Sequence, residues 1–158
     1  MTTLHERIET ALPIGETFAY VADFVNSQVW DPGVATARRI DAGLVGVGSR
    51  YRLGVRLGGR VAPMDYRITV FEPTTRVVLV GSGSGVSAVD DIRFERTDTG
   101  TQIDYTADIR LGGVLRLIQP FLGHAFANLG RNAVDGMQRT LDARAASASH
   151  ARDGADAA

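Results

Sequence analysis

Asp90 is the residue whose type and spacing point most clearly to chemistry. Between residues 86 and 97, Ile92 and Phe94 alternate with charged residues, so a period of two places Asp90 on the same inward face of a strand. A carboxylate that faces an apolar interior should have a raised pKa unless a cation pairs with it. Asp90 would then donate or accept a proton, or anchor a ligand hydroxyl. The alternatives are that a bulge at Asp90 and Asp91 breaks the alternation, or that Asp90 lies at a wet cavity mouth.

Three tyrosines share this inward parity. Tyr51, Tyr66 and Tyr105 each fall on the apolar face of a predicted strand. Three phenols on one concave surface would give a mostly apolar pocket a few directional hydroxyls, as ligand sites usually have. The simpler interpretation is core packing, with each hydroxyl reaching the rim.

His124 is a second candidate for proton transfer. It lies beside the apolar stripe of a predicted C-terminal helix, on the edge that it shares with Phe121 and Asn128. A histidine there could act as a general acid or base near neutral pH. The alternative is a partly exposed side chain on the flank of the helix.

Several other kinds of chemistry lack the residues they need. The three histidines, His5, His124 and His150, have no metal-binding spacing, so no metal site is predicted. The chain has no Cys, and all 17 of its basic residues are Arg, which excludes thiol and lysine chemistry. The serines of residues 81–85 lie in a Gly-rich turn that lacks the context of a nucleophile elbow. A net charge of −1 shows no excess of basic residues, so the sequence does not indicate nucleic-acid binding.

The candidate residues must be positioned by a sheet and one long helix. Alternating apolar residues predict strands, and steps of three or four predict helices. The predicted strands are 5–12, 35–41, 50–57, 64–70, 76–80, 86–97 and 102–111, and the predicted helices are 14–25, 26–30 and 115–141. Pro120 should kink the long helix near its start. Short Gly-containing links between successive strands indicate an antiparallel meander.

This order of elements predicts an α+β fold with an internal cavity. The sheet has one apolar face, and the C-terminal helix is the only long element that can cover it. A strongly bent sheet cannot contact a straight helix everywhere, so space should remain between them. Such spaces are where small molecules bind.

Several segments resemble the START-like, helix-grip (SRPBCC) superfamily, and the closing segment resembles its bacterial polyketide cyclase/dehydrase-like branch. The resemblance covers residues 5–142 and rests on segments 13–23, 30–33, 46–49, 68–73, 92–95, 100–108 and 111–120. It implies a curved antiparallel sheet wrapped around a long C-terminal α-helix, with two short helices after the first strand. In the resemblance, Trp30 precedes Asp31 and Pro32 at the cavity entrance, as a lid residue or a loop anchor.

From the residues and the resemblance together, we expect one ligand-binding domain over residues 1–142 and a flexible or frayed tail over 143–158. The predicted function is binding of a hydrophobic or amphipathic small molecule, lipid or polyketide-like, between sheet and helix. The alternative is a polyketide cyclase or dehydratase that uses the same cavity, with Asp90 and His124 as catalytic candidates. The predicted ligand-binding residues are Trp30, Tyr51, Tyr66, Asp90, Tyr105, Phe121 and His124.

The remaining expectations concern surroundings and partners. No apolar stretch reaches the roughly 18 residues that a membrane span needs. The first ten residues lack a basic segment followed by an apolar run, so no secretory signal is predicted. We expect a cytoplasmic monomer or homodimer that binds no cofactor and no nucleic acid.

Overall fold

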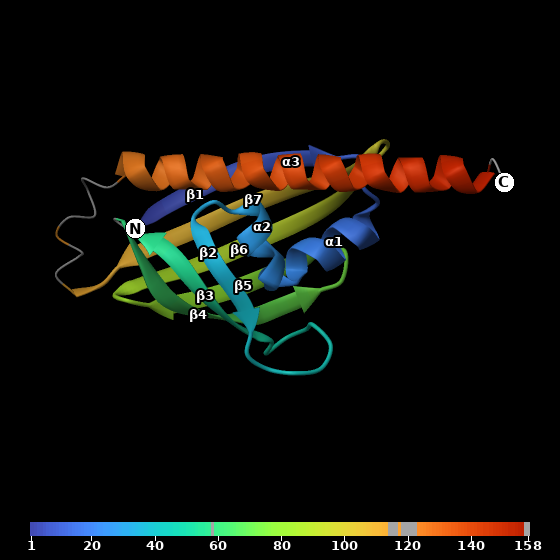
Figure 1. Ribbon diagram of the computed structural model, residues 1–158. Coiled ribbons are helices and arrows are strands. Elements are labelled where there is room, and N and C mark those ends of the chain that lie inside the picture. Colours follow the sequence, from blue (N-terminus) through green and yellow to red (C-terminus); the bar gives the residue numbers. More distant parts are fainter. Residues whose placement is uncertain (58, 114–116, 118–122, 157–158) are drawn as a thin grey trace.

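A single antiparallel sheet of seven strands forms the body of the molecule (Figure 1). The computed structural model describes residues 1–57, 59–113, 117 and 123–156, without the side chains of 123–127 and 152–156. The strand order across the sheet is β1-β7-β6-β5-β4-β3-β2. The strands are β1 (Thr2–Thr10), β2 (Val34–Arg39), β3 (Arg50–Leu57), β4 (Arg60–Glu72), β5 (Arg76–Gly83), β6 (Val86–Thr97) and β7 (Gly100–Leu111).

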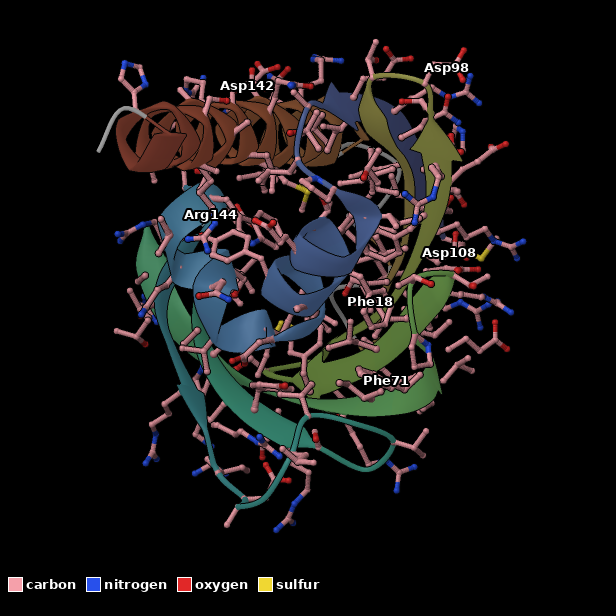
Figure 2. The ribbon with its side chains drawn as sticks, turned by 90° about the vertical axis from the view of Figure 1, so that its right-hand side faces the viewer. Phe18, Phe71, Asp98, Asp108, Asp142 and Arg144 are labelled. Atoms are coloured by element: carbon pink, nitrogen blue, oxygen red, sulfur yellow. The ribbon has the colours of Figure 1, made fainter. Side chains whose placement is uncertain are left out.

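The helices lie on one face of this sheet. α1 (Ile14–Ala22), a short 3-10 helix (Phe24–Asn26) and α2 (Ser27–Trp30) connect β1 to β2, and α3 (Gly123–Asp156) follows the sheet. Viewed along the molecule, the sheet bends around the two small helices and α3 (Figure 2). This is the predicted helix-grip α+β fold, and the sheet and its covering helix are confirmed.

The bend of the sheet has local causes in two strands. The pairing of β2 with β3 shifts register between Val34 and Thr36, and the pairing of β4 with β5 shifts between Ile68 and Val70. A bulge of this kind bends its strand and increases the local twist. The curvature lets both ends of the sheet approach the helices.

Glycines allow α3 to pack closely on its neighbours. Gly130 faces the side chain of Leu4 on β1, and Gly136 faces the carbonyl oxygen of Trp30 at the end of α2; a Cβ at either position would overlap these atoms. Met137 and Leu141, on the same face of α3, are fully buried. The helix therefore joins the first strand to α2 and closes one side of the interior.

The outer face of the sheet carries its charges. Cross-strand pairs join Arg7 to Asp104, Arg52 to Asp65 and Arg76 to Asp91 at N–O distances of 2.7–2.9 Å. Pairs this exposed contribute only about 0–1 kcal/mol each to stability. The pairs are informative in another way, because their positions show which face of each strand points away from the core.

Several boundaries differ from the sequence predictions by a few residues, and two of the differences are in β1 and β5. β1 runs from Thr2 to Thr10 instead of 5–12. β5 continues to Gly83, so only the end of the predicted 81–85 turn is a turn. The glycines there permit the strand to continue, because Gly81 lies under the ring of Tyr66 and Gly83 lies against the backbone of Pro63.

α3 begins at Gly123, whereas the prediction began it near residue 115; Pro120 and its predicted kink lie outside the described residues. The last turns of α3 run beyond the ends of the strands (Figure 1). Described side chains after Ala148 are exposed. A flexible or frayed tail over 143–158 stays a prediction. Within the described residues, no helix is long and apolar enough to cross a membrane.

Candidate functional site

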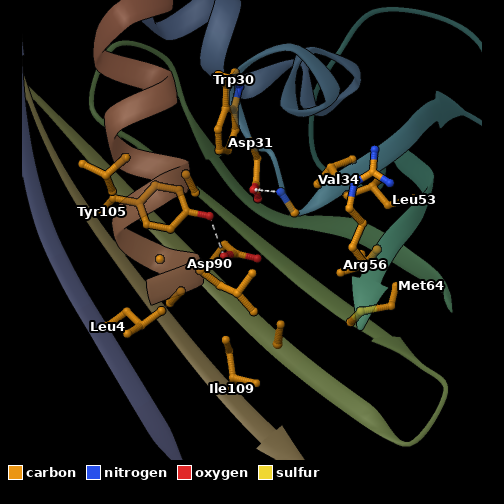
Figure 3. Close-up of a pocket in the computed structure, with 18 of the residues that line it drawn as sticks. Leu4, Trp30, Asp31, Val34, Leu53, Arg56, Met64, Asp90, Tyr105 and Ile109 are labelled. Atoms are coloured by element: carbon orange, nitrogen blue, oxygen red, sulfur yellow. Dashed lines mark hydrogen bonds between the residues drawn. The ribbon is translucent and has the colours of Figure 1, made fainter. Parts of the chain in front are cut away.

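A pocket of about 130 Å³ lies between the inner face of the sheet and α3 (Figure 3). Its walls come from α3, from the segment between the 3-10 helix and the start of β2, and from strands β1, β3, β4, β6 and β7. Most of them are apolar: Leu4, Phe24, Val34, Leu53, Val55, Leu57, Met64, Val86, Ala88, Ala107, Ile109, Leu129, Ala133, Val134 and Met137. The pocket is partly open to solvent, and Leu129 of its lining is 37% exposed.

Asp90 is the most deeply buried ionisable group in this pocket. β6 pairs without a break on both sides, with Asp90 opposite Leu79 and Ala107, so the alternation predicted from sequence holds and no bulge is present there. The side chain is 5% exposed. The Tyr105 hydroxyl donates a hydrogen bond of 2.6 Å to Asp90 Oδ1, and no described group bonds to Oδ2 (Figure 3).

The surroundings of Asp90 favour its neutral form. Burial raises the pKa of Asp90 to about 7; the hydrogen bond from Tyr105 lowers it, and the nearby charge of Asp31 raises it. The desolvation of the carboxylate outweighs the single hydrogen bond. Near neutral pH this carboxyl can therefore both give and accept a proton.

Asp31 is a second carboxyl in the pocket, which the sequence analysis did not select. It follows α2 directly, and its Oδ1 accepts a hydrogen bond of 2.7 Å from the backbone N–H of Gly33. Burial raises the pKa of Asp31 to about 6, although the bond from Gly33 lowers it. The Asp31-Pro32-Gly33 turn predicts such a backbone contact. Nothing in the turn itself predicts that the carboxyl faces a pocket.

The three inward tyrosines have different surroundings. Tyr66 and Tyr105 line the pocket, and burial raises the pKa of each hydroxyl well above its ordinary value. Tyr51 is fully buried but lies outside the pocket lining, with its ring edge-on to Phe24 at 6.3 Å. Burial raises the pKa of Tyr51 to about 12. Its contacts fit the core-packing interpretation.

Trp30 forms one wall of the pocket from the end of α2. It is 1% exposed, and its ring meets Tyr105 edge-on at 6.3 Å and Phe24 at 6.1 Å. This burial suits a loop anchor better than an exposed lid. Phe121 lies outside the described residues, as does the side chain of His124, so the predicted roles of both stay predictions.

Residues 1–147 match the family model described as polyketide cyclase / dehydrase and lipid transport. The chain belongs to this family. Among curated proteins, none matches this sequence.

Solved structures place the family member in the START-like fold. It superposes on a START superfamily protein from Mycobacterium smegmatis with a TM-score of 0.74 and 12% identity, over 89% of this chain and 97% of that one. The Zhui aromatase/cyclase from a Streptomyces species gives a TM-score of 0.73 and 13% identity, over 88% and 92%. A Staphylococcus aureus protein of unknown function gives 0.65 and 14%, over 89% and 93%. At these identities the likeness concerns the fold alone.

In this polyketide cyclase/dehydrase family member, the site joins an apolar enclosure to a few polar groups. The Asp90–Tyr105 pair can bind a hydroxyl, carbonyl or amine, or exchange a proton with it. Within the described residues, no group of histidines, aspartates and glutamates is arranged to hold a metal ion.

Proposed function

We propose that this protein binds a small hydrophobic or amphipathic molecule in the pocket between the sheet and α3. The supporting observation is an apolar enclosure that contains a few convergent polar groups, the Asp90–Tyr105 pair above all. This combination is typical of small-molecule sites, where apolar walls supply affinity and polar groups fix orientation. The family description, which includes lipid transport, agrees with this function.

The size of the pocket limits what fits inside. Its volume of about 130 Å³ is close to that of an engineered apolar cavity of about 150 Å³ that binds benzene. A single ring or a short apolar segment therefore fills it. A lipid or polyketide-like ligand would place only its end there, with the remainder at the opening.

Trp30 provides a direct readout of occupancy, because it is the only tryptophan and it lines the pocket. Titration with ethylbenzene should change the intrinsic fluorescence of Trp30 and saturate. Ala107→Phe fills the pocket from β7 and should abolish saturation while the protein stays folded, since overpacking costs roughly 1–3 kcal/mol.

Ser87→Phe is the matched control for this substitution. It adds a phenyl ring on the exposed side of β6, where Ser87 faces away from the pocket, and should bind ethylbenzene like the wild type. A non-saturating fluorescence response in the folded wild-type protein would contradict the proposed function.

A second candidate is acid–base catalysis on a polyketide-type substrate. A buried carboxyl with a pKa of about 7, hydrogen-bonded to Tyr105, has the properties of a general acid or base. Binding ranks first because the pocket is small for a poly-ketone chain. If the protein is an enzyme, Asp90→Asn should lower turnover of such a chain by about 10²–10⁴-fold. Asp91→Asn, on the outer face, should not.

A further inference from the structure

Three carboxyl groups reach the pocket from three separate elements. Glu6 comes from β1, Asp31 from the segment after α2, and Asp90 from β6. Glu6 lies opposite Tyr105 in the sheet, so it shares the inward parity of the pocket strands. The fold thus brings together in one pocket three carboxyl groups from residues that are far apart in the sequence.

No basic side chain in the described part of the pocket balances this charge. Arg56 is the one basic residue of the lining; its Nε donates to the carbonyl oxygen of Pro32 at 3.2 Å, and its guanidinium points away from Asp90 (Figure 3). Asp31 is bonded to a backbone amide and Asp90 to a phenol. The ion pairs of the described residues all lie on the outer face or in the loop after β2.

This arrangement is unusual for buried acids. Aspartate is rarely buried without a partner cation, because desolvation of an unpaired carboxylate is costly. Asp90 is 5% exposed, yet its Oδ2 has no described partner and faces the pocket (Figure 3). The missing partner can come from a ligand.

We propose that the ligand of this pocket is a small aromatic or alicyclic amine, whose protonated nitrogen pairs with Asp90 and Asp31. The inference rests on the proposed binding function and names the ligand class. The ring of the amine would lie against the apolar walls. The lining also contains the aromatic rings of Trp30, Tyr66 and Tyr105, and a cation over the face of such a ring is attracted to it. An anionic ligand would meet like charges in a desolvated site, which makes it the least favourable class.

The test compares three ligands of nearly equal shape on the full wild-type chain. Benzylamine, benzyl alcohol and ethylbenzene share a phenylmethyl group and differ in one terminal group, which is cationic, neutral and hydroxylic, or apolar. Binding is followed by Trp30 fluorescence and by protein NMR shifts at about pH 8, where most of both aspartates are ionised. Benzylamine should bind roughly tenfold more tightly than the other two.

The pH dependence should identify the carboxylates. Protons compete with the amine for Asp90 and Asp31, so benzylamine affinity should fall between about pH 8 and pH 5.5, whereas ethylbenzene affinity should not fall. The other titratable or charged groups in the described lining of the pocket are few. They are Glu6 on β1, Asp31 after α2, Arg56 on β3, Tyr66 on β4 and Tyr105 on β7; the described lining residues of α3 are all apolar.

Two substitutions are used, so that the test remains informative if one of the variants does not fold. Asp90→Asn and Asp31→Asn each preserve size while removing charge, and each should reduce the preference for benzylamine over ethylbenzene. Asp91→Asn, paired with Arg76 outside the pocket, is the matched control and should keep the full preference. Circular dichroism checks that each variant is folded.

The possible outcomes distinguish a failure of the amine assignment from a failure of the proposed binding function. Saturable binding of ethylbenzene without a preference for benzylamine would overturn the amine assignment and leave the binding function in place. A preference that survives in both Asp→Asn variants would also overturn it. Absence of saturable binding by all three ligands would remove the inference and the proposed function together.

Discussion

At the scale of single residues, the site depends on one carboxyl and its phenol. Asp90 has 5% exposure and a single described hydrogen bond, from Tyr105. Strand parity predicted its inward position from Ile92 and Phe94, and that position is confirmed. Parity could not predict Tyr105 as its partner, because the pairing of β6 with β7 determines which side chains meet.

Tyr105→Phe should raise the pKa of Asp90 above its value of about 7. The hydrogen bond from Tyr105 stabilises the carboxylate, and its loss leaves desolvation unopposed by any described donor. The measurement is an NMR titration of side-chain carboxyl carbons, with Asp90→Asn to assign the resonance. Tyr66→Phe is the control, since Tyr66 lines the same pocket without a hydrogen bond to Asp90. Equal shifts in both variants would contradict the assigned role of Tyr105.

At the scale of elements, the pocket depends on how closely α3 approaches its neighbours. The apolar spacing of α3 predicted a helix that covers the sheet, and Met137 and Leu141 are buried as that spacing requires. The close contacts at Gly130 and Gly136 were not predictable, because a glycine inside a helical pattern has no single meaning. Gly81 is a comparable case in a strand: the Gly-rich segment predicted a turn, but Gly81 lies in β5 under Tyr66.

Gly136→Ala should destabilise the protein, against the usual trend for helices. An interior Gly→Ala change normally stabilises a helix by about 0.8–1.0 kcal/mol. At Gly136 the new Cβ would overlap the carbonyl oxygen of Trp30, a backbone atom that cannot move without shifting α2. We expect a loss of roughly 1–3 kcal/mol in unfolding free energy, measured by chemical denaturation, together with altered Trp30 fluorescence.

Gly15→Ala is the matched control for this prediction. Gly15 lies in α1, where an added Cβ would meet no heavy atom within 4 Å. It should therefore follow the ordinary trend and stabilise slightly. A stabilising effect of Gly136→Ala would show that α2 and α3 are not in the close contact described.

At the scale of the whole molecule, the sequence predicted the architecture better than the site. Alternation along strands such as Tyr51–Leu57 in β3 is a local property, so it determines which side chains face inward. Alternation gives Tyr51 and Tyr66 the same inward face, and they are direct partners across β3 and β4, yet only Tyr66 lines the pocket. That difference depends on the shape of the assembled sheet and on what packs against it, which local alternation does not contain. Asp31 also lines the pocket because of tertiary packing: it follows α2, which packs against α3 at Gly136.

The charge distribution of the whole molecule predicts how its stability depends on pH. The pocket carboxyls Asp90 and Asp31 have pKa values raised from the ordinary 3.8 to about 7 and about 6. The outer-face carboxyls that pair with arginine have lowered pKa values: Asp65, Asp91 and Asp104. Titration of the outer-face carboxyls changes the free energy of unfolding below about pH 4. Titration of the pocket carboxyls changes it between about pH 4 and pH 7.

Within the upper range, the folded protein holds more protons than the unfolded chain, because its pocket carboxyls stay protonated to higher pH. Stability from these groups is fully present below about pH 4 and is lost as pH rises through about 6 and 7. The slope is at most about 1.4 kcal/mol per pH unit for each fully shifted group. Asp90→Asn resembles the protonated form at every pH while it can still accept the bond from Tyr105.

Asp90→Asn should therefore gain stability over the wild type as pH rises from about 5 to about 8, with the largest gain above about pH 7. Urea denaturation at steps of one pH unit measures the difference directly and cancels contributions that both proteins share. Asp91→Asn should change differently, because it removes a carboxylate that Arg76 stabilises, and it should lose a small, nearly constant amount over this range. Parallel curves for the wild type and Asp90→Asn would mean that water or a cation already stabilises the Asp90 carboxylate, and the pocket would then have no unpaired charge for an amine to neutralise.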